Sequence, residues 1–162
     1  EYQQSTSNPR VYAAGDVADT QGIPLTPVAV FEGHVAASNI IKGNSKPVRF
    51  DEMPTVVFTS PPMASVGLTE ERAKAQNKEY EVKSGDASGW FNAYRSQAKA
   101  YAYKVLINKE DGTLLGAHLV GPSADETINL FALAMKAKIP AKTLQRMIYS
   151  YPTWASDLSY MV

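Results

Sequence analysis

The strongest constraint on the fold is a pair of apolar segments joined by an Asp-Gly turn. Within residues 100–108, large apolar side chains recur at every second position, as they do in a strand with one buried face. These side chains are Tyr101, Tyr103, Val105 and Ile107. Asp111-Gly112 favours a tight reversal of the chain, and residues 114–120 form a second apolar run. The sequence therefore predicts an antiparallel hairpin.

Shorter segments on both sides of this hairpin complete the pattern of an α+β domain. The other strands are predicted at residues 55–59, 64–67 and 80–88, and the helices at 68–77, 123–138 and 141–149. Thr69 and Ser123 stand at N-cap positions, and acidic residues follow them in the first turns. The helix at 123–138 has too many apolar residues for one narrow stripe, so it is either internal or partly an interface. We predict an antiparallel β-sheet with helices packed on one side.

Composition argues against several kinds of partner. Sixteen basic and sixteen acidic residues give a formal net charge of zero. The sequence has no cluster of basic residues that would attract nucleic acid or an anionic membrane. Cysteine is absent, so the sequence has neither a disulfide framework nor a thiol of its own. No run is apolar enough to span a bilayer, and the first ten residues do not resemble a signal peptide. We expect no nucleic acid, no membrane and a cytoplasmic location.

The first forty residues have the pattern of half a ligand site. The apolar run 11–14 leads into Gly15-Asp16, which places a carboxylate at the carboxyl end of a predicted strand, where open α/β sheets bind ligands. Thr26 and Pro27 then match the N-cap and the first position of a helix over residues 27–42, whose amino end presents unpaired amides. On spacing alone, a helix- or turn-capping role for Asp16 is favoured over a ligand contact. One strand and one helix cannot bury both faces of a parallel sheet, so this segment is interpreted as the tail of a larger domain.

Several segments, in the right order, resemble the flavin-dependent pyridine nucleotide–disulfide oxidoreductases, the family of glutathione reductase, dihydrolipoamide dehydrogenase and mercuric reductase. Residues 11–16 resemble the second flavin-binding motif of that family, and residues 25–29 resemble the segment beneath the isoalloxazine ring. Residues 58–70 resemble the beginning of the C-terminal dimerisation domain. Residues 115–122, together with Glu126, resemble the strand-to-helix corner of that domain.

The resemblance implies that residues 1–43 are a strand-helix remnant of the FAD-binding domain and that residues 44–162 are the dimerisation domain. It implies that Asp16 hydrogen-bonds a ribityl hydroxyl of FAD. The residues that it places at the flavin N1–O2 edge are Leu25, Thr26 and Pro27. The family's Gly-rich phosphate loop, cysteine pair and nicotinamide domain match nothing in this sequence. We therefore expect a C-terminal fragment, inactive and without tightly bound FAD by itself, from a homodimeric parent that uses FAD and NAD(P)H.

Residues 151–157 depart from the family pattern. Most disulfide reductases of the family have His-Pro-Thr here, with a Glu five residues after the His, and this His acts across the subunit interface as acid–base for the thiol pair. Tyr151 stands at the His position and Ser156 at the Glu position, while Asp157 comes one place late. A phenol is a poor base at neutral pH but can donate a hydrogen bond or a proton. Tyr151 is thus either a catalytic substitute or an interface aromatic, and Tyr151-Pro152 is a candidate cis peptide bond.

Three functions fit these residues. The first is the dimerisation end of an FAD-dependent NAD(P)H oxidoreductase that acts on a disulfide or a related acceptor. The second is a metal-ion reductase, because mercuric reductases also have Tyr in place of the His. The third is a self-associating interaction module without catalysis. No metal site is expected, because neither His34 nor His118 has a second ligand at metal-binding spacing, and both are interpreted as structural.

Overall fold

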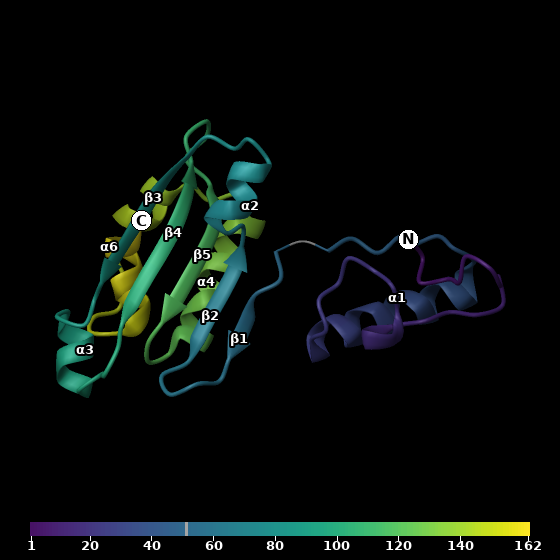
Figure 1. Cartoon of the computed structure of the whole chain (residues 1–162), viewed down its shortest axis with the longest axis horizontal. Helices are drawn as coiled ribbons and strands as arrows, with labels where there is room; N and C mark the ends of the chain where they lie inside the picture. Colours follow the sequence, from purple (N-terminus) through teal and green to yellow (C-terminus); the bar gives the residue numbers. More distant parts are fainter. Residues whose placement is uncertain (51) are drawn as a thin grey trace. The chain divides into compact units, whose positions relative to one another are not determined.

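The computed structural model describes residues 1–50 and 52–162, and the chain divides into two compact units (Figure 1). We call Glu1–Asp51 the N-terminal unit and Glu52–Val162 the C-terminal unit. Within the described ranges, no helix combines the length and the apolar character that a membrane crossing requires. Each unit is described separately below.

The C-terminal unit is built on a five-stranded antiparallel sheet with the strand order β1-β2-β5-β4-β3. The strands are β1 (Thr55–Val57), β2 (Met63–Gly67), β3 (Tyr80–Asp86), β4 (Ala102–Asn108) and β5 (Leu114–Val120). The predicted hairpin is the β4–β5 pair, and it lies inside the sheet with β2 and β3 on its two sides. The alternation in β4 places Val105 at 0% exposure and Tyr101, just before the strand, at 5%. The hairpin and its buried face are therefore confirmed.

Helices cover one face of this sheet, as Figure 1 shows for α4 and the C-terminal segments behind the strands. The helices of the unit are α2 (Glu70–Ala75), α3 (Phe91–Ser96), α4 (Ala124–Lys136), α5 (Ala141–Arg146) and α6 (Leu158–Met161). α4 packs on β2 and β5, and its Ile128 and Phe131 are completely buried. Burial of each of these side chains is worth about 1.5–3 kcal/mol. The predicted α+β class, an antiparallel sheet with helices packed on one side, is confirmed.

α4 is amphipathic rather than internal on all sides. Its Leu133 is 63% exposed and its Leu130 is 37% exposed, although the opposite face is core. Ser123 does not cap this helix through its side chain, because its backbone takes the left-handed conformation, with φ of 57°. Thr69, in contrast, caps α2 as predicted, since its Oγ1 accepts a hydrogen bond from the Arg72 amide.

One boundary near the C-terminus differs from the sequence prediction, and three short elements of this unit were not predicted. α5 ends at Arg146 rather than near residue 149, because the backbone becomes extended at Met147. The short elements α3, η2 (Trp154–Asp157) and α6 were not foreseen, since helices of four to six residues carry too little periodicity to be recognised. The Tyr151-Pro152 bond is cis, as the sequence predicts, and Ser60-Pro61 is also cis.

The N-terminal unit consists of the short η1 turn (Gly15–Val17) and the long α1 helix (Thr26–Lys42), together with extended segments. The strand predicted at residues 11–14 is wrong: Tyr12 forms only an isolated bridge with Gln4. The physical reason is that a strand needs a partner for its backbone groups, and this unit provides one residue of pairing. The prediction for the helix is nearly right, and Gly43 ends it with φ of 64°.

The start of α1 needs a correction. Leu25 is the N-cap residue, and Thr26 is the first helical residue, so Thr26 does not have the predicted capping role and makes no capping hydrogen bond. Pro27 lies in the first turn, where its missing amide hydrogen costs little.

A close backbone crossing fixes α2 against the sheet. Gly116 of β5 pairs with Gly67 of β2, and a Cβ built on Gly116 would lie 2.1 Å from the Leu68 carbonyl oxygen. No side chain fits at that distance, so the segment after β2 crosses β5 only because residue 116 is glycine.

We therefore predict that Gly116→Ala lowers the free energy of unfolding by about 2–3 kcal/mol, because backbone atoms must move apart. The matched control is Gly89→Ala, since a Cβ on Gly89 meets nothing within 4 Å and the change should stay within about 0.5 kcal/mol. Urea denaturation followed by circular dichroism measures both variants. Equal stability of the two variants would show that the crossing is not tight in solution.

Candidate functional site

A buried carboxylate organises the loop that carries Asp16. Glu32 of α1 is 1% exposed and accepts hydrogen bonds from the Gly15 amide at 2.6 Å and from Thr20 Oγ1 at 2.7 Å. Thr20 Oγ1 in turn accepts from the Gly22 amide at 3.1 Å. Residues 15–22 are thus held against α1 by one side chain, and charge-assisted bonds of this kind are the stronger class of hydrogen bond.

This loop and α1 enclose a cavity of about 170 Å³. Asp16 lines the cavity and is exposed, and Val28 and Ala29 line it from the helix. Gly15 has φ of +75°, and a Cβ there would lie 3.2 Å from Ala29 Cβ, so the turn approaches the helix closely. The structure brings Asp16 next to the first turns of α1, but Leu25, Thr26 and Pro27 do not line this cavity.

Sequence reasoning missed Glu32. The helical face predicted from apolar residues included Phe31 and Ile40, which are 42% and 61% exposed, while Glu32 and Asn39 are buried among Val35 and Ala36. The signal was present, because Glu32 lies four residues after Val28 and three before Val35 and so shares their face. A carboxylate on an otherwise apolar face requires hydrogen-bond donors, and the preceding loop supplies them.

The second candidate region surrounds Tyr151 in the C-terminal unit. Tyr151 is 64% exposed, and its ring stacks on Phe91 with centroids 5.9 Å apart. A pocket of about 270 Å³ lies beside it, lined by Trp90, Phe91, Tyr151, Asp157 and Tyr160. The structure therefore gives Tyr151 aromatic neighbours and open access to solvent.

Asp157 does not take over the role of the missing Glu as a partner of Tyr151. It is 4% exposed, and its two carboxylate oxygens accept hydrogen bonds from Asn92 Nδ2 at 2.9 Å and from Tyr101 Oη at 3.0 Å. Burial raises the pKa of Asp157 by more than these two bonds lower it, and burial also raises the pKa of Tyr101. Ser156 caps η2 reciprocally with Thr153, so the position of the family Glu is used structurally.

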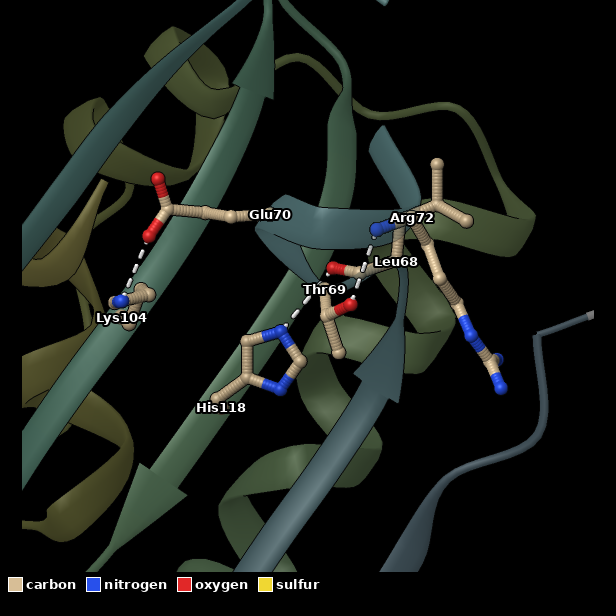
Figure 2. A network of polar contacts seen from close by, with 6 residues as sticks. All are labelled: Leu68, Thr69, Glu70, Arg72, Lys104 and His118. Carbon is tan, nitrogen blue, oxygen red and sulfur yellow. Dashed lines mark hydrogen bonds and ion pairs between the residues drawn. The ribbon is translucent and has the colours of Figure 1, made fainter. Parts of the chain in front are cut away.

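The two histidines lie in different environments. His34 is an exposed residue of α1. The ring of His118 on β5 contacts Ser65 Oγ through Nδ1 and the Leu68 carbonyl through Nε2, the latter at 3.1 Å (Figure 2). A carbonyl only accepts, so Nε2 carries the hydrogen and donates it. Lys104 Nζ of β4 forms an ion pair with Glu70 of α2 at 2.8 Å (Figure 2). The His118 contact and this ion pair both hold the α2 segment to the sheet.

The comparisons with known proteins agree with this architecture. Residues 53–162 match the family described as pyridine nucleotide-disulphide oxidoreductase, dimerisation domain. The HOCl-induced flavoprotein disulfide reductase RclA from Escherichia coli shares the fold, with a TM-score of 0.87 at 23% identity over 99% of this chain and 37% of that chain. The C-terminal unit thus has the fold of a flavoprotein disulfide reductase's dimerisation domain.

Sequence similarity extends over the N-terminal unit as well. An uncharacterised 19.7 kDa protein in a mercuric resistance operon of Staphylococcus aureus is 50% identical over 162 residues, which are all of this chain and 90% of that protein. A mercuric reductase from Bacillus cereus is 37% identical over 161 residues, which are 97% of this chain but 25% of that enzyme. This chain belongs to the pyridine nucleotide-disulphide oxidoreductase family, and residues 53–162 are its dimerisation domain.

The raised pKa of Asp157 predicts a pH-dependent stability. Between the pKa values of the unfolded and folded states, the folded chain keeps a proton that the unfolded chain has lost. The resulting stabilisation is complete below the unfolded value and disappears as the pH rises through the folded value. Relative to Asp157→Asn, the wild type should therefore lose stability as the pH rises from about 4 towards 7.

Urea denaturation over that pH range measures the effect, and Asp111→Asn, compared in acid below about pH 4, is the control with the opposite sign. Hydrogen bonds from Thr113 lower the pKa of Asp111, so the wild type should gain stability relative to that variant as the pH rises from acid. Parallel pH profiles for wild type and Asp157→Asn would contradict the prediction.

Proposed function

We propose that this chain is the dimerisation end of an FAD-dependent NAD(P)H oxidoreductase that acts on a disulfide or a related acceptor. The observation that carries the proposal is the match of residues 53–162 to a dimerisation domain, in a unit that leaves large apolar side chains exposed. Ile148 is 99% exposed, Tyr151 is 64% and Leu133 is 63%. Burial of such side chains against a second copy favours a two-fold homodimer.

The N-terminal unit would supply one wall of the flavin site. Asp16 is exposed beside the cavity, its loop is fixed by Glu32, and a carboxylate can accept hydrogen bonds from ribityl hydroxyls. FAD supplies hydride and electron transfer when it is bound. The cavity of about 170 Å³ is smaller than a typical cofactor pocket, so the present residues fit one edge of the flavin and not the complete molecule. Leu25, Thr26 and Pro27 would contact the flavin outside this cavity.

The chain alone is proposed to be inactive. It spans 25% of the mercuric reductase and 37% of the RclA chain, and its sequence contains no cysteine. Electron transfer to a disulfide therefore needs groups that these 162 residues do not supply. We place the parent enzyme in the cytoplasm, where NAD(P)H is available as the electron donor.

A mercuric-reductase-like activity is the second candidate. Tyr151 replaces the family His, and the relatives include a mercuric reductase and a protein from a mercuric resistance operon. In this reading Tyr151 donates a hydrogen bond or a proton rather than accepting one, because a phenol is protonated at neutral pH. Oxidation of NADPH that depends on Hg(II), measured on the flavoenzyme assembly that contains this chain, favours this candidate over a disulfide. Absence of both activities favours a purely self-associating module.

The homodimer predicts a selective effect of charge at residue 148. Ile148→Glu should weaken self-association at least about tenfold, because burying a carboxylate in an apolar contact is costly. Ile41→Glu is the matched control, since Ile41 is 81% exposed on α1 of the N-terminal unit. Sedimentation velocity across a concentration series measures both variants. A wild-type chain that remains monomeric at high concentration would rule out the homodimer.

The flavin half-site predicts weak and local binding. We expect the chain to be colourless after purification and FAD at high concentration to shift the amide resonances of residues 15–18 and 28–29. Asp16→Ala should abolish these shifts, whereas Asp19→Ala, an exposed aspartate outside the cavity lining, should leave them unchanged. Riboflavin should reproduce the shifts and ADP should not, because the contact is with the ribityl chain. Purification with one flavin per chain would contradict the half-site.

A further inference from the structure

The pocket beside Tyr151 is lined mainly by aromatic side chains. Four of its five lining residues are aromatic: Trp90, Phe91, Tyr151 and Tyr160. Trp90 and Tyr160 meet edge to face with centroids 5.6 Å apart, and Phe91 and Tyr151 are stacked. Each contact holds the two rings of its own pair against one another, so each wall consists of two packed rings and not of a single side chain.

The fifth lining residue is the buried carboxylate of Asp157. Its two hydrogen-bond donors, Asn92 and Tyr101, are both neutral. Arg95 Nε donates to Asn92 Oδ1 at 3.2 Å, so this guanidinium acts on the carboxylate through an amide and not through a direct ion pair. A buried carboxylate is either neutralised by protonation or compensated by an opposite charge, and burial raises the pKa of Asp157. When this carboxylate is ionised, the pocket is the side from which a compensating cation can reach it.

A metal ion does not suit this pocket. Calcium and magnesium take six or more oxygen ligands, whereas the walls here offer aromatic faces and one carboxylate that already accepts two hydrogen bonds. Aromatic faces attract large cations of low charge density, above all quaternary and methylated ammonium groups. A volume of about 270 Å³ is sufficient for such a group but small for a drug-sized ligand.

We propose that this pocket binds an alkylammonium cation, held by the aromatic walls and neutralised by Asp157. The cation is either a free small molecule or a cationic side chain of a second copy of this chain, since both present the same chemistry. The proposal does not depend on the proposed oxidoreductase function, because it uses only the geometry around Asp157.

Titration with tetramethylammonium chloride tests the proposal, with sodium chloride at equal ionic strength as the reference. The readout is the indole N–H resonance of Trp90. tert-Butanol is a neutral control of similar size, and it should not shift Trp90 at the concentrations at which tetramethylammonium does. Equal shifts with tert-butanol would overturn the proposal, because the pocket would then select size and not charge.

Two variants distinguish the contribution of the carboxylate to cation binding from that of the aromatic walls. Asp157→Asn keeps the side-chain size and should weaken tetramethylammonium binding about tenfold, and Tyr160→Leu should weaken it several-fold. Tyr94→Leu is the matched control, because Tyr94 is 79% exposed on α3 and does not line the pocket. If Asp157→Asn does not fold, the tetramethylammonium affinity of Tyr160→Leu still tests the proposal. Binding at wild-type strength in the folded Asp157→Asn variant or in Tyr160→Leu would overturn the proposal.

Sedimentation in the same titration identifies the source of the cation. If a side chain of a second copy occupies the pocket, tetramethylammonium should dissociate the dimer, and Asp157→Asn should weaken it. If the natural ligand is free, the dimer should remain intact while Trp90 shifts. A monomeric chain that still binds tetramethylammonium supports this proposal and contradicts only the proposed homodimer.

Discussion

The structure of the C-terminal unit depends on burying one face of the sheet under α4 and the C-terminal segment. β4 and β5 pair along most of their length, with an irregularity between Leu106 and Ile107, and α4 contacts β2 and β5. Val105, Ala117, Ile128 and Phe131 are all completely buried there. The C-terminal segment adds Leu158 and Met161 to the same core, and the hydrogen bonds of Asp157 fix its position. The crossing at Gly116 fixes α2.

The N-terminal unit is held together differently, because buried polar side chains replace an apolar core. Glu32 fixes the loop that precedes α1, and Asn39 bonds to Tyr2 and to both backbone groups of Lys46. Apolar residues of the same helix remain outside, with Ile41 81% exposed and Val30 55% exposed. Exposed apolar groups on a helix favour contact with further protein, which supports the proposal that this unit is one wall of a larger site.

The elements that could be predicted are those in which the hydrophobic periodicity extends over enough residues to indicate a strand or a helix. Apolar side chains recur at every second position from Tyr101 to Ile107, and α4 has an apolar face over thirteen residues. Both elements were predicted with errors of one or two residues at their ends. The strand prediction at residues 11–14 failed because only Tyr12 pairs there, in an isolated bridge with Gln4. The six-residue α3 is stabilised by Asn92, which bonds to Thr153 and Asp157 more than sixty positions away, and no local pattern encodes such a contact.

The same reasoning explains why the sequence pointed to Tyr151 but not to the pocket beside it. Motif comparison singles out positions 151 and 156 because the family has ionisable residues there, and it treats Asp157 as out of register by one place. In the structure, Ser156 caps the short helix η2, and the carboxylate of Asp157 accepts hydrogen bonds from Asn92 and Tyr101. Asp157 is thus a buried carboxylate among aromatic rings, and the proposed cation site rests on it. The contacts of Ser156 and Asp157 are not encoded in the family motif, which is why motif comparison alone does not find the pocket.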